Sequence, residues 1–397
     1  MWKFLIYVIA IMMIKTADGT IKNVISIVIV PTDICNMHCV YCYHVPHYSS
    51  KKIMTFETLE NIMKKTIPYY DYVNFLWHGG EPLVCGVEFY KKVVELEKKY
   101  NINDAIITNK MQTNCTLAKG EILDYLISQN FQFGTSFDGV TNELTRGNST
   151  RILEGRQNII DKNSKCSCIS VITSLNVHKM IENYKFFNEK GINYKFNHYI
   201  NTTKDEIGNK LQLDINEYLT EEKKLFEYWL YDKNCKIRLT SFFVFLEYIL
   251  FNRKILGKYN SCLGKWIGIR YNGDIVQCNR YNQSFYGNIN EVAKIDDAFN
   301  SAGFTKILEL AVARRNKCAK FCDVYDFCRG GCIVEASHEK GITELNGFSC
   351  IETKEMYNYI LKKINYVRDN YSTVKEQLNP TVVNCFNQYF EKIKEKV

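Results

Sequence analysis

Three cysteines stand close together near the amino end of the chain, where they could hold a metal. Cys35, Cys39 and Cys42 fall within eight residues, directly after an apolar run that we predict to be a buried strand. Three thiolates on one loop can hold three corners of a cubane iron-sulfur cluster and leave its fourth iron open to a ligand. A zinc site completed by His38 or His44, or a set of buried free thiols, is also compatible with this spacing.

A glycine-rich turn, Gly79-Gly80-Glu81-Pro82, follows the second predicted strand. Two glycines allow a backbone to approach a ligand closely, and Glu81 could accept hydrogen bonds from an ammonium group. Such a turn is an ordinary loop when it stands alone. Beside a loop of three cysteines, it indicates a ligand with an amino group next to the metal.

Together these two segments resemble the radical SAM superfamily. In that family a three-cysteine loop binds a 4Fe-4S cluster, and the turn at Gly79–Pro82 resembles the one that holds the amino group of S-adenosyl-L-methionine. The resemblance implies that this cofactor chelates the open iron and that an electron from the cluster cleaves its sulfonium bond. The resulting 5'-deoxyadenosyl radical abstracts a hydrogen atom, while the protein orients the cofactor and excludes water.

The same resemblance implies further contacts to the cofactor. Tyr41 takes the place of the aromatic residue beside the adenine. Four polar residues near the ends of the third and fourth strands would face the ribose and the carboxylate: Gln112, Thr113, Asn114 and Ser136. Ordinary turn chemistry at strand ends would explain the same residues. Either Arg146 or Arg151 could pair with the carboxylate.

Seven further cysteines lie between residues 262 and 350, a segment that resembles a SPASM domain with two auxiliary 4Fe-4S clusters. A zinc ribbon would need two Cys-x-x-Cys pairs, which this segment lacks. The resemblance implies one cluster on Cys262, Cys278 and Cys332, and a second on Cys318, Cys322, Cys328 and Cys350. We therefore predict three 4Fe-4S clusters in all.

Two details of this segment depart from a complete pair of clusters. Three residues separate Cys318 from Cys322 where the family usually has two, and we expect a loop to absorb the difference. Seven thiolates cannot fill eight ligand positions, so one iron is open or takes another ligand, for which Cys235 is the nearest spare thiol. The remaining cysteines are predicted to be small buried hydrophobic residues: Cys85, Cys115, Cys166, Cys168 and Cys385.

The whole pattern is similar to anaerobic sulfatase-maturating enzymes and to related peptide maturases. In the sulfatase-maturating group an aspartate commonly follows the second SPASM cysteine and acts as base, whereas Asn279 stands here. Because an amide cannot accept a proton at neutral pH, this residue argues against formylglycine formation. We therefore predict a maturase that abstracts hydrogen from a peptide residue and forms a crosslink such as a thioether; its catalytic base is not identified.

Three alternatives to crosslinking stay open: oxidation of a Cys or Ser to formylglycine, action on a small molecule, and a non-catalytic iron-sulfur electron carrier. The implied partners are a peptide or protein substrate and a reductant such as a flavodoxin or ferredoxin. The net charge of +8 is scattered, and no element carries a basic stripe interleaved with aromatic residues. Nucleic acid is therefore not an expected partner.

Six strand-like runs alternate with helix-like runs in the first part of the chain. The predicted strands are 24–30, 73–77, 105–108, 131–137, 169–173 and 194–199, and the predicted helices are 55–69, 121–129, 152–161 and 177–190. Parallel strands joined by helices bind ligands beyond their carboxyl ends, where the two motifs lie. The predicted fold class is α/β, with a partial (β/α)6 TIM-like barrel, a loop-rich iron-sulfur SPASM domain and a helical C-terminal tail.

Five segments are predicted along the 397 residues. They are an apolar extension at 1–21, the barrel at 22–235, a helical bridge at 236–261, the SPASM domain at 262–352 and a tail at 353–397 that Asn379-Pro380 divides into two helices. The apolar stretch of the extension is too short to span a bilayer as a helix. We expect it to form a strand or helix packed on the barrel, with an interfacial anchor as the alternative. A cytoplasmic location is expected because an exported chain would have difficulty acquiring iron clusters.

Overall fold

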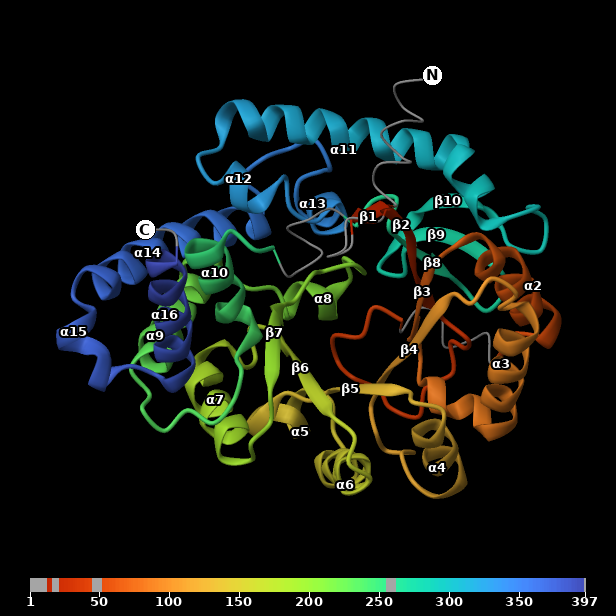
Figure 1. The fold of residues 1–397 in the computed structure, drawn as a ribbon, viewed down its shortest axis with the longest axis horizontal. Helices are drawn as coiled ribbons and strands as arrows, with labels where there is room; N and C mark the ends of the chain where they lie inside the picture. The colour runs from red at the N-terminus through yellow and green to blue at the C-terminus, as the bar shows by residue number, and fades with distance from the viewer. Residues whose placement is uncertain (1–12, 16–20, 45–51, 255–261, 396–397) are drawn as a thin grey trace. The chain divides into compact units, whose positions relative to one another are not determined.

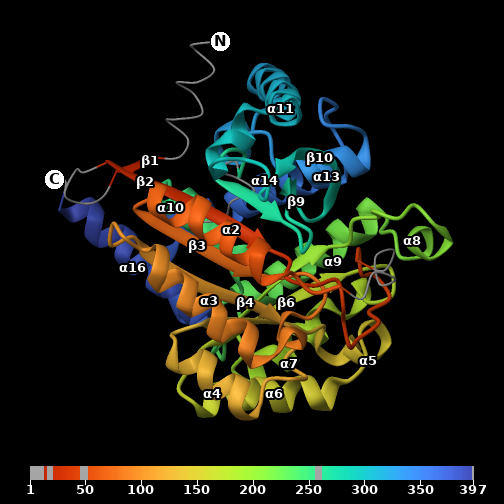
Figure 2. The same ribbon diagram turned by 90° about the vertical axis from the view of Figure 1, so that its right-hand side faces the viewer.

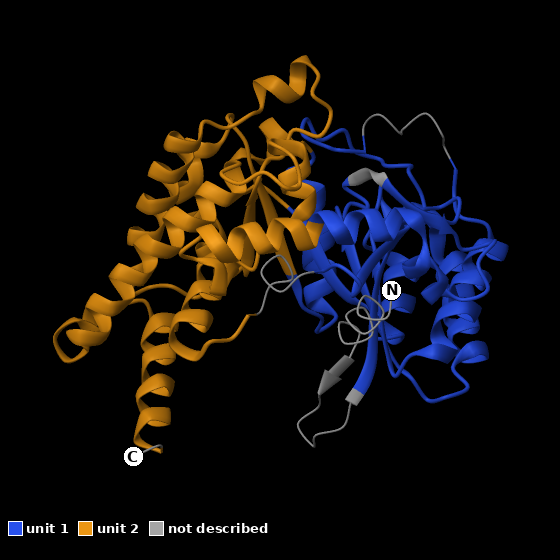
Figure 3. Ribbon diagram, turned by 90° about the horizontal axis from the view of Figure 1, so that it is seen from above, with its two compact units in different colours: residues 1–136, 148–166, 262–310 blue, residues 137–147, 167–261, 311–397 orange. Residues whose placement is uncertain are grey.

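The computed structural model describes residues 13–15, 21–44, 52–254 and 262–395. The chain divides into two compact units (Figure 3). Unit 1 comprises residues 1–136, 148–166 and 262–310, and unit 2 comprises residues 137–147, 167–261 and 311–397. Each unit takes residues from the predicted barrel and from the predicted cysteine-rich domain. This division into two units does not test the five predicted domain boundaries, which stay predictions.

Unit 1 is built on a sheet whose central strands run parallel (Figure 1). β2, β3, β4 and β5 lie side by side in chain order, and each pairs in parallel with the next. Beyond β2, β8 pairs in parallel, and β9 and β10 continue as antiparallel strands. The strands are β2 Ile21–Ile29, β3 Tyr72–Trp77, β4 Ile106–Thr113, β5 Gln132–Ser136, β8 Trp266–Ile269, β9 Asp274–Cys278 and β10 Tyr281–Asn288.

Helices follow the strands of unit 1 and cover them (Figure 2). They are α2 Phe56–Thr66, α3 Gly86–Tyr100, α4 Gly120–Ser128 and α6 Ser149–Asp161, with short 3-10 helices at Ile67–Tyr69, Pro82–Cys85 and Ile295–Asn300. The core lies between strands and helices, where Ile27, Phe75 and Trp77 are fully buried. Trp77 packs edge-on against Phe89 and Tyr90 of α3, with ring centroids 6.1 and 5.6 Å apart.

Unit 2 contains the last two barrel strands, which pair in parallel, and most of the helices. The strands are β6 Cys166–Ile172 and β7 Tyr194–His198. The helices are α5 Asn142–Thr145, α7 Met180–Glu189, α8 Glu206–Lys210, α9 Ile215–Leu230, α10 Thr240–Phe251, α12 Tyr325–Cys328, α13 Ile333–Glu339, α14 Phe348–Asp369, α15 Tyr371–Val374 and α16 Pro380–Lys394. A further helix, α11 Ala302–Phe321, begins in unit 1 and ends in unit 2.

The alternation of parallel strands with helices confirms the predicted α/β class and the partial TIM-like barrel. All six predicted strands exist, although β4 continues five residues past the predicted end at Thr108. Asn379 caps α16 by accepting from the backbone N–H of Thr381 at 2.8 Å, so the Asn-Pro pair does divide the tail.

Several helices were not predicted, the longest of them α3 and α11. α3 follows the glycine-rich turn directly, and the 20-residue α11 lies within the segment predicted to be loop-rich, so that description was wrong there. At the amino end, β1 Met13–Lys15 pairs antiparallel with β2, as the strand alternative expected. The rest of the extension, residues 1–12 and 16–20, lies outside the described residues. None of the helices that the structure describes is long and apolar enough to cross a membrane.

Candidate functional site

The loop that carries the first three cysteines leaves the carboxyl end of β2 and is held by Thr32. The Thr32 hydroxyl donates to the Lys52 carbonyl at 2.9 Å and accepts from the Ile34 N–H at 3.0 Å. Further along, the Cys42 N–H donates to the Cys39 carbonyl at 3.1 Å, which turns the loop back on itself. These hydrogen bonds hold the backbone of the loop that carries the cysteines.

The Gly79–Pro82 turn lies directly against this loop. The N–H of Gly80 donates to the Thr32 carbonyl at 3.0 Å, and the N–H of Glu81 donates to the Ile34 carbonyl at 2.8 Å. A Cβ on Gly80 would lie 2.2 Å from the Ile34 oxygen, and Gly79 has a φ of 121° that other residues rarely adopt. The two glycines are needed because the turn touches the cysteine loop through its backbone.

Glu81 is buried and binds the end of β4. Its carboxylate accepts from the N–H of Leu83 at 3.0 Å, from the hydroxyl of Thr113 at 2.7 Å and from the N–H of Asn114 at 2.7 Å. Three of its roughly four acceptor sites are thus used within the protein. Glu81 fixes the turn to the neighbouring strand, a role that the sequence did not indicate, and its contact to a cofactor stays a prediction.

The predicted polar residues lie at the carboxyl ends of β4 and β5, with Asn114 directly after β4. The Asn114 amide donates to the Asn36 side chain at 2.8 Å and has its nitrogen 4.0 Å from the Cys35 sulfur. Gln112 donates to the Ser136 hydroxyl at 2.9 Å. Unit 1 therefore brings the cysteine loop, the glycine-rich turn and the ends of β4 and β5 into one site.

The three predicted residues with aromatic or cationic side chains differ in exposure. Tyr41 lies half-buried on the cysteine loop. Arg151 is exposed at the start of α6 in unit 1, whereas Arg146 is half-buried in unit 2. Their contacts to a cofactor stay predictions.

The chemistry of the donor set fits an iron-sulfur cluster. Burial raises the pKa of the Cys35 thiol to about 12, and negative charge on Glu81, Cys39 and Cys42 raises it further, so these groups lie close together. Soft thiolate ligands suit an iron-sulfur cluster, which three cysteines of one loop could hold at three corners.

Comparisons with known proteins agree with this site. Residues 29–187 match the radical SAM superfamily. The chain carries a radical SAM domain. It is 28% identical over 360 residues to a cysteine-type anaerobic sulfatase-maturating enzyme of Clostridium perfringens, a match that covers 85% of this chain and 96% of that enzyme. This confirms the family and the enzyme class predicted from the two motifs.

Solved structures show the same likeness. The native enzyme anSMEcpe with bound AdoMet is 26% identical, with a TM-score of 0.77 over 87% of this chain and all of that chain. Streptococcus suis SuiB bound to the precursor peptide SuiA shares the fold, with 19% identity and a TM-score of 0.58 over 88% of this chain and 79% of that chain. The radical SAM family uses a 4Fe-4S cluster and S-adenosyl-L-methionine. That the loop around Cys35 holds them in this chain stays a prediction.

Two of the later cysteines lie in unit 1 with the radical SAM loop. Burial raises the pKa of the Tyr43 hydroxyl far above its usual range, and negative charge on Cys278 and Cys42 raises it further, which places Tyr43 near both thiols. The Gln277 amide nitrogen lies 3.8 Å from the Cys262 sulfur. Asn279, next to Cys278, is buried, and neither polar atom of its side chain has a hydrogen-bond partner within the described residues.

The predicted cluster ligands of unit 2 lie at or beside helix ends. Cys318 is in the last turn of α11, and the Cys322 N–H donates to the Cys318 carbonyl at 2.9 Å. The expectation that a loop absorbs the extra residue was wrong, because three intervening residues make one helical turn. Burial raises the pKa of Cys318, nearby Arg314 lowers it, and the charges of Cys350 and Cys322 raise it, so both of these thiols lie in the electrostatic neighbourhood of Cys318.

A buried arginine organises the loop that carries two more predicted ligands. Arg314 of α11 is 5% exposed, and its Nε donates to the Gly330 carbonyl at 2.6 Å, between Cys328 and Cys332. Gly330 and Gly331 have φ values of 94° and 65°, which favour glycine, so the backbone turns tightly between Cys328 and Cys332. Cys235 is buried in unit 2 and donates to the Ile237 carbonyl at 3.2 Å. Of the remaining cysteines, Cys115, Cys166, Cys168 and Cys385 are buried as predicted, and Cys85 is half-buried.

One polar cluster beside Cys350 was not predicted at all. His198, the last residue of β7, has its Nε2 3.1 Å from the Ser349 hydroxyl and its Nδ1 3.1 Å from the Glu352 carboxylate. The Ser349 N–H donates to Glu339 at 2.9 Å. These contacts tie β7 to the first turn of α14 on both sides of Cys350. No local pattern indicates them, since His198 and Ser349 are 151 positions apart.

Proposed function

We propose that this radical SAM enzyme is a maturase that abstracts a hydrogen atom from a residue of a peptide or protein and forms a crosslink such as a thioether. The observation that carries the proposal is the contact between the cysteine loop and the Gly79–Pro82 turn through the hydrogen bonds of Gly80 and Glu81. An electron carrier would need the cysteines but not a second loop fixed beside them. When bound, the cluster and S-adenosyl-L-methionine would supply the radical that starts the reaction.

The protein's own residues would orient the cofactor. Cys35, Cys39 and Cys42 would hold three corners of the cluster, while backbone groups of the turn would face the amino group of S-adenosyl-L-methionine. Glu81 keeps the turn on the end of β4, so the positions of both loops depend on each other. Burial lowers the pKa of His78 to about 4, with a further contribution from Arg280. Its imidazole ring would therefore be uncharged at neutral pH.

We propose two auxiliary 4Fe-4S clusters, one on Cys262, Cys278 and Cys332 and one on Cys318, Cys322, Cys328 and Cys350. The electrostatic influence of Cys322 and Cys350 on Cys318 and the helical turn that joins Cys318 to Cys322 support the second set. For the first set, the partnerless side chain of Asn279 beside Cys278 is the supporting observation, since cluster sulfurs would offer acceptors to its N–H group. The Cys235 thiol already donates a hydrogen bond to a backbone carbonyl. This favours an open iron in the first set over ligation by Cys235.

Formylglycine formation is the second candidate function, because sulfatase-maturating enzymes match most of this chain over nearly their whole length. Asn279 argues against it, since its amide cannot take up a proton at the position where those enzymes are expected to have an aspartate that acts as base. A flavodoxin or ferredoxin as reductant and a cytoplasmic location complete the proposal, because reduced clusters need an electron donor and a reducing compartment.

The reaction is tested with anaerobically reconstituted, reduced protein and S-adenosyl-L-methionine. We expect the wild type to form 5'-deoxyadenosine and the Cys39→Ala variant to form none while keeping its auxiliary iron. Cys385→Ala, which removes a buried thiol of α16, is the matched control and should retain cleavage. Cleavage by Cys39→Ala at the wild-type rate would refute the cofactor site, and its absence in the wild type would favour an electron carrier.

The mass of a treated peptide separates the two enzymatic functions. A crosslink and an aldehyde formed from Ser each remove two hydrogens, whereas an aldehyde formed from Cys also removes sulfur. Cp18Cys, the peptide seen with anSMEcpe in a solved structure, is the probe for the second function. We expect no aldehyde on Cp18Cys, and aldehyde formation at a rate comparable to cofactor cleavage would establish sulfatase maturation instead.

A further inference from the structure

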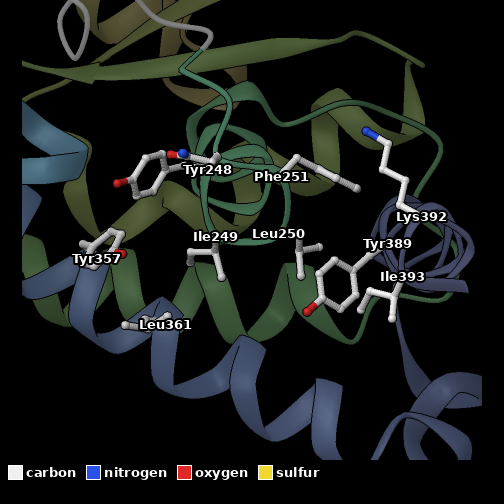
Figure 4. Close-up of a pocket in the computed structure, with 10 residues that line it drawn as sticks. Tyr248, Ile249, Leu250, Phe251, Tyr357, Leu361, Tyr389, Lys392 and Ile393 are labelled. Carbon is white, nitrogen blue, oxygen red and sulfur yellow. The ribbon is translucent and has the colours of Figure 1, made fainter. Parts of the chain in front are cut away.

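A pocket of about 640 Å³ opens in unit 2 between the end of α10, the middle of α14 and the last turns of α16. Figure 4 shows aromatic and aliphatic side chains around it and one lysine at its side. The lining residues are Tyr248, Ile249, Leu250, Phe251, Asn252, Tyr357, Leu361, Tyr389, Lys392 and Ile393. None of them belongs to the cysteine sites described above. The volume is that of an ordinary ligand site and would take one or two large side chains.

The walls of the pocket are apolar surface that the described chain leaves partly uncovered. Phe251 contacts Tyr389 with ring centroids 6.4 Å apart, and Tyr248 contacts Tyr357 at 6.1 Å, so the rings brace one another. All four rings are half-buried, and Ile393 is 41% exposed. Preformed aromatic walls on three helices suit an apolar side chain, because covering them removes further surface from water at little cost in ordering.

The edge of the pocket is positively charged. The Lys392 ammonium lies 5.1 Å from the centroid of the Phe251 ring, the Arg253 guanidinium lies 4.7 Å from the same centroid, and the Lys254 ammonium lies 5.4 Å from that of Tyr248. Arg253 is paired with a carboxylate of Glu247 at 3.2 Å. Within the described residues no ion pair engages Lys392, and no acidic residue lines the pocket. An occupant that adds negative charge would therefore meet an unopposed cation.

We propose that this pocket binds an acidic segment of the peptide or protein substrate, with a large aliphatic or aromatic side chain of that segment inserted between the rings. This inference rests on the proposed function and adds a docking site separate from the residue that is modified. The pocket wall also leads toward a predicted cluster ligand. Tyr248 and Tyr357 each contact Phe327 with ring centroids 5.0 Å apart, and Phe327 precedes Cys328. A substrate held here would be anchored on the helices that carry this part of the cysteine-rich segment.

The test measures binding of a fluorescein-labelled hexapeptide in which leucine and phenylalanine stand between two pairs of glutamates. We expect the reconstituted full chain to bind it, and Lys392→Glu to weaken binding at least about tenfold by replacing attraction with repulsion. Lys362→Glu is the matched control, because Lys362 is exposed on α14 but does not line the pocket, and its affinity should equal that of the wild type. Ile393→Trp, at an exposed position, should weaken binding by filling the pocket.

Two control peptides test the chemistry of recognition. Replacing the glutamates with lysines, or the leucine and phenylalanine with alanines, should reduce binding at least as much as Lys392→Glu. Equal binding of all three peptides, equal weakening by Lys362→Glu, or binding of laurate in place of the acidic peptide would overturn the proposal. Because the assay needs no S-adenosyl-L-methionine, a protein that binds the peptide yet forms no 5'-deoxyadenosine would refute the proposed function and leave the docking site supported.

Discussion

At the scale of single residues, the site depends on backbone contacts that only glycine permits. Gly80 approaches Ile34 so closely that an added Cβ would lie 2.2 Å from the carbonyl oxygen and 2.7 Å from the carbonyl carbon. Neither atom is the end of a flexible side chain, so the backbone of the cysteine loop would have to move. The glycine-rich turn and the cysteine loop are therefore one structural unit, although 44 positions separate Gly80 from Asn36.

We expect Gly80→Ala to lose S-adenosyl-L-methionine binding by at least about tenfold, because a displaced loop misplaces both the cluster and the groups that face the cofactor. Gly120→Ala is the control. Gly120 also has a positive φ, of 61°, but no atom lies within 4 Å of the added Cβ, so this change introduces strain of about 1 kcal/mol without a collision. Titration calorimetry on reconstituted protein measures the affinity, and unchanged affinity in Gly80→Ala would contradict the coupling.

The residue types of the site were predictable, but most of their roles were not. Cysteine spacing and the Gly-Gly-Glu-Pro sequence identified the two loops, because those signals are local. The carboxylate of Glu81 was expected to face a ligand. It also accepts hydrogen bonds from Thr113, the last residue of β4, and from Asn114, which follows that strand. Such partners are set by tertiary packing, which periodicity along the chain does not encode.

At the scale of elements, the missed helices carried readable signals. In α11, Phe304, Ile307, Leu308 and Ala311 are buried at helical spacing, although the segment was expected to be a ligand-bearing loop. α3 shows the same pattern at Phe89, Val93 and Glu97, in a stretch for which no helix was predicted. The segment was predicted to be loop-rich because of its seven cysteines and its glycine turns, and the helical spacing within α11 was overlooked.

Glu97 gives α3 a measurable dependence on pH. Burial raises the pKa of its carboxyl to about 7, against an ordinary 4.5, while a hydrogen bond from Asn109 at 2.9 Å partly offsets this. Since the folded state binds the proton more tightly than the unfolded state, the folded protein loses stability as the pH rises from about 4.5 to about 7 and stays constant above that. Glu97→Gln removes the ionisation and therefore this loss.

We expect Glu97→Gln to gain about 2 to 3 kcal/mol relative to the wild type between about pH 5 and about pH 8, since a tenfold change in the dissociation constant corresponds to about 1.4 kcal/mol. Urea-induced unfolding at the two pH values measures the difference. Glu154→Gln, an exposed change on α6, should show no such dependence. A gain for Glu97→Gln that is the same at both pH values would contradict the buried ionisation.

At the scale of the whole molecule, the cysteine-rich segment does not form a separate compact body. Its β8, β9 and β10 extend the sheet of the barrel in unit 1, and its later helices belong to unit 2. Sequence patterns predicted a boundary near residue 262 because the composition changes there. Strand pairing between β2 and β8 crosses that boundary, and no local signal reports a partner strand so far away in the chain.

The iron content tests how the ten predicted ligands are shared. We expect about twelve irons per reconstituted chain as three 4Fe-4S clusters. Cys39→Ala and Cys322→Ala should each lose about four irons, and the double variant about eight, because the proposed ligand sets place these two cysteines on different clusters. Cys168→Ala, which removes a buried thiol that belongs to none of the proposed ligand sets, should keep the wild-type iron content. Iron and sulfide assays with electron paramagnetic resonance measure these values. A wild-type content near four would eliminate the auxiliary clusters and leave the radical SAM site alone, whereas a loss of eight in either single variant would show that the two groups of cysteines assemble together.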